Sequence, residues 1–565
     1  MSENRNMFLA ILLSIVVLFG WAAISERFFP TPKSNEPVSA AQTADSAAPV
    51  ATAPTVLRDR AAVIAEGERV AIRTPALSGS INLTGARIDD LLLLRHDETL
   101  KKDSAKVRLF SPSGAPGAYF AEFGWTGAKT LPTAATVWKA NAPTLTPEQP
   151  VTLSWTNADD QTFLIELSVD KDYLFTAKQS IVNRGNAALV ARAYGLVARV
   201  GTGPDQSTFN AHVGPIGVFG GKTNYDYNYY DIDEAPAREV DFRSKGGWIG
   251  FTDKYWLSAL VPGNDTTFDA NFRSGGDERY QAGVRGEPVA VGPGQSAVVT
   301  TRLFAGAKEV DVLDRYQDDL GIVRLGSAID WGWFEVIAKP IFHLLDWLFE
   351  KVGNLGVAII CLTILIRFVL FPIANKQYAS MAKMRAVQPK MKALQERYKD
   401  DKLKLQQEMM ELYKTEKVNP LAGCLPILLQ IPIFYALYKT LFLVIDMRHQ
   451  PFYLWIKDLS APDPLTPVNL FGLLPFTPPA FIGIGVLPIL LGITMWLQQK
   501  LNPQPLDEIQ QKVFAILPWM FMIIMAPFAA GLQLYWTVNN IISIAQQWVL
   551  IKKHPAPAPE PVKAK

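Results

Sequence analysis

Residues 355–372 form an apolar run, LGVAIICLTILIRFVLFP, that contains a single charged residue, Arg367. As a helix rising about 1.5 Å per residue, this run is roughly long enough to cross the ~30 Å hydrocarbon core of a bilayer. Arg367 would then lie about 8 Å inside the far end of the helix. A guanidinium at that depth is costly unless water or an anion reaches it. The run therefore predicts a membrane helix, and the position of Arg367 within it must be accounted for.

Two interpretations of Arg367 compete. In the first, the long side chain reaches back to the membrane interface and acts as a positive anchor on the cytoplasmic side. In the second, it lines a water-filled cavity and presents its charge to an acidic group. Thr363 lies one turn earlier on the same helix face, so a polar stripe would point inward. This spacing favours the cavity.

The chain of 565 residues is too long for a single core, and two or more domains are expected. Its two cysteines, Cys361 and Cys424, both lie in apolar segments, which excludes a disulfide framework and a cysteine metal site. His96 and His212 have no companions at ligand spacing. We therefore expect no metal and no cofactor.

The first part of the chain predicts an anchor, a tether and a β-domain. An apolar run follows Arg5; it could be a cleaved signal peptide, but it is long and lacks an A-x-A site, so we interpret residues 1–29 as an uncleaved transmembrane anchor. Residues 30–62 are rich in proline and alanine and predict a disordered linker. Over residues 63–325, short alternating runs separated by turn residues predict an antiparallel β-sandwich of a dozen or more strands.

Two stretches of this β-domain are weak candidates for chemistry. Residues 214–223, GPIGVFGGKT, resemble a phosphate loop, but Ile216 stands where that motif needs glycine. The tyrosine-rich residues 224–234 could form a sugar or peptide cleft, although an irregular loop packed on the sandwich is the interpretation we favour. A carbohydrate enzyme would need paired carboxylates in a cleft. The weak candidates for that role are Asp231, Asp233 and Glu234.

Beyond residue 330 the pattern becomes helical. Residues 331–351 carry an apolar stripe typical of an amphipathic helix in the membrane interface, with a soluble core helix as the alternative. We predict a second transmembrane helix over residues 355–373 and the third to sixth within residues 421–551. Between them, residues 375–419 hold eleven Lys or Arg against six Asp or Glu. This segment predicts a basic helical hairpin, in which Gln388 and Pro389 fit a helix start.

The two apolar stripes of the hairpin are rich in methionine, so they could bind varied partners or simply pair as a coiled coil. Positive charge also gathers around Lys500 and Lys512 and in the tail, residues 552–565. By the positive-inside rule these segments lie in the cytoplasm with Arg5. We therefore predict a multi-pass protein with both termini in the cytoplasm and the β-domain outside it. The short, proline-containing span over residues 513–528 would thin the bilayer around it.

Residues 380–438 resemble the YidC/Oxa/Alb family of membrane protein insertases. The run KVNPLAGCLPILLQIPIF is a long and specific match, and the similarity extends over residues 331–550 and to SKGGWIGF at residues 244–251. The resemblance implies a polytopic α-helical protein of the bacterial inner membrane. It would have an N-terminal anchor, a five-helix insertase core around a hydrophilic groove, and a large periplasmic antiparallel β-supersandwich domain.

The resemblance also implies roles for individual residues. Arg367 matches the groove arginine, with Thr363 and Gln430 beside it; Tyr535 matches one of two family tyrosines, and Trp536 replaces the other, which removes a hydroxyl acceptor. Apolar residues of the third and fifth spans would offer an emerging helix a sliding surface. These are Ile427, Ile431, Phe434, Phe514 and Phe521. The basic residues expected to recruit the nascent chain are Lys383, Arg385, Lys390, Lys392 and Arg397.

The expected activity is insertion and folding of nascent inner-membrane proteins, alone or with the Sec translocon, without covalent chemistry. Expected partners are nascent membrane proteins, the Sec translocon, the ribosome, the signal recognition particle receptor and the lipid bilayer, with no specific nucleic-acid sequence. One alternative is a solute transporter or channel that binds an anion at Arg367, although no inverted repeat is evident. The other is a periplasmic carbohydrate enzyme on a membrane tether.

Overall fold

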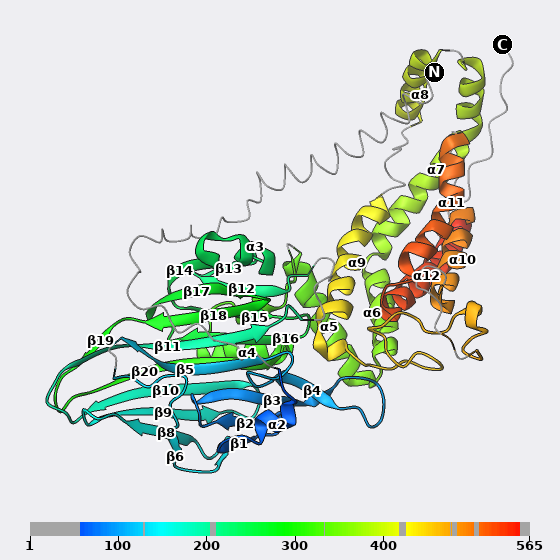
Figure 1. The fold of residues 1–565 in the computed structure, drawn as a ribbon. Helices are drawn as coiled ribbons and strands as arrows, with labels where there is room; N and C mark the ends of the chain where they lie inside the picture. The colour runs from blue at the N-terminus through cyan, green and yellow to red at the C-terminus, as the bar shows by residue number, and fades with distance from the viewer. Residues whose placement is uncertain are drawn as a thin grey trace. The chain divides into compact units, whose positions relative to one another are not determined.

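The computed structural model describes residues 57–127, 130–203, 211–332, 334–399, 401–416, 425–474, 476, 483–501 and 508–553. The predicted anchor, most of the tether and nearly all of the tail lie outside these residues. The chain divides into two compact units after Asp330, a β-unit followed by a helical unit (Figure 1).

The β-unit contains two large sheets. One has the order β14-β17-β18-β11-β5-β3-β2-β1-β7, with β19 paired to β11 and β4 to β3; the other has the order β13-β12-β15-β16-β20-β10-β9-β8-β6. The first sheet consists of β1 (Arg69–Arg73), β2 (Leu77–Asn82), β3 (Arg87–Asp97), β4 (Lys106–Phe110), β5 (Tyr119–Gly127), β7 (Thr144–Leu145), β11 (Leu189–Val200), β14 (Glu239–Lys245), β17 (Thr267–Gly276), β18 (Arg279–Gly286) and β19 (Val289–Val291). The second consists of β6 (Lys139–Ala140), β8 (Val151–Thr156), β9 (Gln161–Val169), β10 (Leu174–Asn183), β12 (Gly214–Phe219), β13 (Lys222–Asn224), β15 (Gly247–Thr252), β16 (Trp256–Pro262) and β20 (Ser296–Ala307).

In the described part of the β-unit, the paired strands are antiparallel except for β1 with β7. The sheets meet through aromatic rings on their inner faces. Trp125 on β5 lies 5.3 Å from Phe163 on β9, and Phe219 on β12 stacks at 4.2 Å on Phe242 of β14. The predicted antiparallel β-sandwich is therefore confirmed.

The stretch SKGGWIGF owes its glycines to close packing between strands. Gly247 has φ +106°, and a Cβ added there would lie 2.0 Å from the carbonyl oxygen of Val218 on β12. Only glycine fits such a position. The next residue, Trp248, is fully buried and its indole N–H donates to the Val323 carbonyl at 3.1 Å. This motif thus serves the packing of the β-unit.

The tyrosine-rich stretch is not an irregular loop throughout. Residues Tyr229–Glu234 form helix α3, and Asn228 and Asp231 make a reciprocal capping box at its start. Such a box satisfies two backbone N–H groups that would otherwise lack partners. The expectation of an irregular loop is therefore wrong for residues 229–234. The sequence signal that was missed is an asparagine three residues before an acidic residue.

The remaining short helices of the β-unit are α2 (Arg60–Ile64), η2 (Pro236–Arg238) and η3 (Leu325–Ala328). The longer α4 (Val310–Leu320) follows β20 and ends at Gly321 in a left-handed conformation, as helix ends often do.

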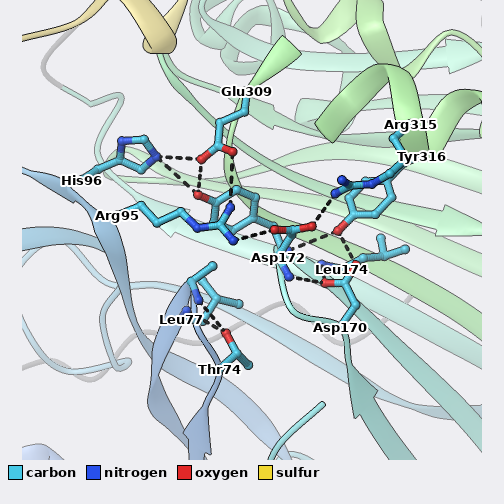
Figure 2. Close-up of polar contacts among 12 residues, drawn as sticks. Thr74, Leu77, Arg95, His96, Asp170, Asp172, Leu174, Glu309, Arg315 and Tyr316 are labelled. Carbon is cyan, nitrogen blue, oxygen red and sulfur yellow. Dashed lines mark hydrogen bonds and ion pairs between the residues drawn. The ribbon is translucent and has the colours of Figure 1, made fainter. Parts of the chain in front are cut away.

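A cluster of charged groups ties α4 to both sheets (Figure 2). Glu309, just before α4, accepts hydrogen bonds from Tyr173 and from Arg95 at 3.4 Å, and pairs with His96 Nε2 at 3.0 Å. Asp172 binds Arg95 at 2.6 Å and also Arg315 of α4. Arg95 and His96 lie on β3 of one sheet, whereas Asp172 and Tyr173 lead into β10 of the other. The cluster therefore joins the two sheets and α4.

The helical unit contains eight α-helices within the described residues. They are α5 (Glu335–Val352), α6 (Leu355–Val369), α7 (Phe371–Arg397), α8 (Lys402–Thr415), α9 (Leu425–Leu443), α10 (Val486–Leu501), α11 (Glu508–Met525) and α12 (Ala530–Lys553), with short turns η5 (Ile445–Met447) and η6 (Pro467–Asn469). Helix α12 contacts α6, α7, α9 and α10, and α5 contacts α6 and α9. Across these described ranges, no helix is at once long enough and apolar enough to cross a membrane.

Helix α6 ends at Val369, and α7 begins at Phe371 with Pro372 in its first turn. Proline has no N–H to donate to the preceding turn and suits the first turn of a helix, which favours the break between α6 and α7 at this point. The hairpin helix therefore starts four residues before the predicted residue 375.

Pro389 does not start a helix, contrary to the sequence expectation. It lies inside α7, which continues to Arg397. The neighbours Val387 and Met391 are buried against α8. We attribute the unbroken helix to this packing, which offsets the backbone hydrogen bond that proline lacks. A turn at residues 398–399 follows α7, and Asp401 caps α8 by accepting from Lys404 N at 3.0 Å, whereas Asp400 of the predicted turn lies outside the described residues.

In α5 the buried line is Ala338, Phe342 and Leu345. Ile337, assigned to the apolar stripe, is exposed, as are Val336 and Trp347. The helix thus has one apolar line packed inside the helical unit and further apolar side chains on its surface.

We expect Glu309→Gln to lower the stability of the β-unit at neutral pH. The stability of the variant should also fall less steeply than that of the unchanged protein as the pH is lowered. Burial alone would raise the pKa of Glu309, but hydrogen bonds from His96 and Tyr173 and the positive charges of His96 and Arg95 outweigh it and lower the pKa. A carboxylate with a lowered pKa stabilises the fold above its unfolded pKa, and that contribution is lost as pH falls through the folded value. The substitution should lower the free energy of unfolding by about 1–3 kcal/mol at pH 7. This difference should become smaller below about pH 4.

The measurement is hydrogen–deuterium exchange of peptides from β20 and α4 in the full-length protein, from neutral to acidic pH. The control is Glu287→Gln, because Glu287 forms an exposed pair with Arg243 and such pairs contribute at most about 1 kcal/mol. An equal effect of both substitutions at every pH would contradict this account of the cluster.

Candidate functional site

Arg367 is held by an amide from another helix. Its Nε donates to Oδ1 of Asn539 on α12 at 2.8 Å, and the arginine side chain is partly buried. Asn539 is itself buried on α12, which packs against α6. The buried side of α12 also carries other polar residues, among them Thr537 and Asn540. An amide oxygen orients a guanidinium without neutralising it. The contact therefore fixes a positive charge between the apolar helix α6 and a polar stretch of α12.

The same region of α12 carries a second polar contact. Gln430 on α9 donates from Nε2 to the hydroxyl of Tyr535, which is buried. Thr363 lies one turn before Arg367 and is buried, but its hydroxyl donates to the carbonyl of Ile359 in its own helix at 2.6 Å. The structure thus links Arg367 and Gln430 to α12, whereas the hydroxyl of Thr363 bonds within α6.

Trp536 lies between two phenylalanines assigned to the sliding surface. Its ring is 5.5 Å from Phe434 on α9 and 5.1 Å from Phe521 on α11, edge-on in both cases. Its indole nitrogen is buried and has no hydrogen-bond partner among the residues that the structure describes. Trp536 thus forms an aromatic contact among three helices, next in the chain to Tyr535 and its polar contact.

The structure describes the side chains of two of the three other residues assigned to the sliding surface. Ile431 on α9 and Phe514 on α11 are exposed. The side chain of Ile427 lies outside the described residues.

In the hairpin, the two apolar stripes pack on each other. Val387 and Met391 of α7 are buried against α8, and the residues packed around them are Met384, Met409, Leu412 and Tyr413. This packing favours the paired-helix interpretation of the stripes over a methionine surface open to partners. Among the assigned basic residues, Lys383, Lys392 and Arg397 are exposed, and Lys390 pairs with Glu416 at 2.7 Å. The side chain of Arg385 lies outside the described residues.

Two residues near the site were not singled out from the sequence. Asn539 was one of several polar residues in an apolar segment, and nothing in the sequence paired it with Arg367. Lys439 is fully buried on α9, with its ammonium 5.6 Å from the ring centre of Tyr435. The sequence feature that could have pointed to Lys439 is that it is the single lysine in the apolar run of residues 425–445.

The carboxylates considered for a carbohydrate enzyme serve local structure. Asp231 caps α3, Asp233 accepts from Ser274 and from Tyr280 at 2.7 Å, and Glu234 accepts from Tyr230. His212 Nε2 contacts the Pro215 carbonyl at 2.7 Å, and burial lowers its pKa. These groups are engaged with neighbouring residues of the β-unit.

Two family descriptions match the chain. "YidC periplasmic domain" matches residues 69–344, and "60Kd inner membrane protein" matches residues 347–557. The insertase YidC of Zymomonas mobilis is 50% identical over 557 residues, covering 98% of this chain and 96% of the relative. Those of Methylorubrum extorquens and Sinorhizobium medicae are each 45% identical, with the same coverage of 98% and 96%.

Among solved structures, an active YidC insertase matches with a TM-score of 0.35 and 16% identity, covering 85% of this chain and 94% of that one. Family membership rests on the sequence relatives, which match along nearly the whole chain. The two descriptions also assign a periplasmic domain to the β-unit and an inner-membrane protein to the helical unit. On this evidence the chain belongs to the family of YidC membrane protein insertases.

Proposed function

We propose that this chain inserts nascent proteins into the bacterial inner membrane and assists their folding, without covalent chemistry. The observation that carries the proposal is the positive charge of Arg367, oriented by Asn539 between the apolar helix α6 and α12. A charge within a membrane helix is costly unless water or a polar partner reaches it, and such charges commonly mark functional sites. The names of the sequence relatives support the same activity.

In this proposal, the polar contacts of Arg367 and Gln430 line a hydrophilic groove. A nascent protein with a short polar outer segment must carry that segment across while its apolar helix enters lipid. Water in the groove would lower the cost of desolvating the segment, and Arg367 would attract its acidic residues. The membrane potential adds about 2.3 kcal/mol per charge per 100 mV.

The aromatic group of Phe434, Trp536 and Phe521 supports a polypeptide substrate over a small anion. It places an apolar surface directly beside the polar contacts. A small anion needs only the positive charge. A polar segment of a nascent chain that is followed by an apolar helix needs both the polar contacts and the apolar surface. We assign the exposed Ile431 and Phe514 to the continuation of this surface toward lipid.

The proposed topology places the α7–α8 hairpin and both termini in the cytoplasm and the β-unit in the periplasm. Its support is the charge distribution of the sequence and the family description of the β-unit. The exposed residues Lys383, Lys392 and Arg397 would then recruit the ribosome-bound chain or the signal recognition particle receptor. Cooperation with the Sec translocon is part of the same proposal.

Substitutions at Arg367 should distinguish an electrostatic role in the groove from a role as a membrane anchor. In cells depleted of their own insertase, we expect Arg367→Lys to support insertion of a short, acidic-tailed, single-span substrate. Arg367→Ala and Arg367→Glu should reduce insertion by about tenfold or more, equivalent to ~1.4 kcal/mol. Neutralising the acidic tail should restore insertion by Arg367→Ala. The measurement is protease protection of the tail at matched expression, and equal insertion by all variants would show that Arg367 is only an anchor.

Asn539→Asp should affect acidic substrates selectively. The substitution keeps an oxygen acceptor for Arg367 but adds a negative charge that cancels its attraction for acidic segments. We expect insertion of the acidic-tailed substrate to fall about tenfold, or ~1.4 kcal/mol, while a neutral-tailed version inserts as before. Equal losses for both substrates would mean that the aspartate only disturbs the fold.

Charge reversal in the hairpin should weaken recruitment. We expect the triple variant Lys383→Glu, Lys392→Glu and Arg397→Glu to bind ribosome–nascent chain complexes several-fold less tightly, with a smaller salt dependence. The matched control reverses three exposed charges of the β-unit, Arg73, Lys178 and Lys222. Binding is measured by co-sedimentation with vesicles holding the full-length protein. Similar binding by both triple variants would contradict recruitment by the hairpin.

A further inference from the structure

The connection between α9 and α10 is fastened to the ends of two helices (Figure 1). The buried Asp463 accepts from Leu487 N in the first turn of α10 at 2.7 Å and from the indole of Trp455 at 2.9 Å. The carbonyls of Leu459 and Ala461 accept from the first residues of α12, at 2.9 and 2.7 Å. These contacts fix residues 459–463 of the connection on the first turns of α10 and α12.

Residues 466–474 of the connection form a turn that has polar side chains inside and apolar side chains outside. Thr466 and Asn469 are buried, and Asn469 Oδ1 accepts from Thr466 Oγ1 at 3.1 Å and from Gly472 N at 2.9 Å. The surrounding side chains are apolar and exposed, with Leu473 reaching 82%. We call these residues the apolar tip: Leu470, Phe471, Leu473, Leu474 and Phe476. In water the favoured arrangement is the reverse, with apolar groups covered.

The backbone of the turn is held in a conformation that exposes the apolar tip. Leu470 and Phe471 have φ of 50° and 57°, which bulky residues rarely adopt. Hydrogen bonds from Phe471 N to the Thr466 carbonyl at 2.9 Å and from Leu474 N to the Asn469 carbonyl at 3.1 Å fasten it there. Internal bonding of backbone groups is also what a chain in contact with hydrocarbon requires.

The surroundings of the apolar tip are uncharged. No charged residue occurs between Asp463 and Lys500. Exposed apolar side chains are also found on α10, at Leu490, Ile493 and Leu497. Helices of an inner-membrane protein present such faces to lipid. An acidic or basic partner surface would find no complementary charge here.

We propose that the apolar tip inserts into the lipid leaflet at the end of the helical unit opposite the α7–α8 hairpin. The ligand is the acyl-chain region beneath the phospholipid headgroups. The buried Thr466 and Asn469 satisfy the polar groups of the turn, so that its outer surface can enter hydrocarbon. Only the naming of this leaflet as the periplasmic one rests on the proposed function.

The test is spin labelling of the full-length protein in vesicles of phosphatidylethanolamine and phosphatidylglycerol. Cys361 and Cys424 are replaced by serine, and a nitroxide is attached at Leu473→Cys or, separately, at Phe476→Cys. Power saturation compares collisions with oxygen, which concentrates in hydrocarbon, and with a water-soluble nickel chelate. We expect both labels to collide at least several-fold more with oxygen than with the chelate. A label at Lys457→Cys, on an exposed polar residue of the same connection, should show the opposite preference.

Chelate collisions at Leu473 and Phe476 as frequent as at Lys457 would overturn the proposal, because the apolar tip would then lie in water, free for a protein partner or substrate. The measurement needs no substrate and no insertion. Failure of the proposed insertase function therefore leaves this test unaffected, and insertion assays of the labelled variants report on that function separately.

Discussion

The central constraint on the helical unit is the cost of placing polar groups among apolar helices. Arg367 and Asn539 meet between α6 and α12, and Gln430 and Tyr535 meet between α9 and α12. Each contact joins two helices, so the polar groups that suit a hydrophilic substrate also connect the helices around them. Helix α12 carries one partner of each contact, which makes it the common support of the candidate site.

The same cost explains features away from the site. Gln533 donates to the carbonyls of Met525, Ala526 and Phe528, which lie at and just after the end of α11, where the helix leaves carbonyls without intrahelical partners. Asp463 serves the first turn of α10 in the same way. In the β-unit, Glu309 and Asp172 are matched by Arg95, His96 and Arg315. These polar groups of both units are therefore arranged in pairs or networks, and the pair of Arg367 with Asn539 belongs to the same pattern.

Much of the architecture could be predicted from the sequence, because alternation and apolar runs carry the information for strands and helices. The β-sandwich and the two hairpin helices were predicted this way, whereas the pairing of the hairpin stripes was one of two alternatives. Pro389 and the α3 capping box were missed because packing against α8 and a local side-chain bond override residue preference. Arg367, Gln430 and Tyr535 could be selected by resemblance, but the partner of Arg367 could not. Asn539 lies 172 positions from Arg367, and only the packing of α6 on α12 reveals the pair.

The most direct test of the central claim is whether water reaches the polar contacts in the resting protein. In a variant lacking native cysteines, Gln430→Cys and Phe368→Cys are treated in intact membranes with a water-soluble maleimide, which reacts with thiolates and therefore needs water. Phe368 follows Arg367 directly and is 76% exposed on the outer face of α6, where lipid is expected. The account predicts fast labelling at residue 430, slowed by a stalled nascent chain, and little labelling at residue 368. Equally slow labelling at both positions would contradict a hydrated groove.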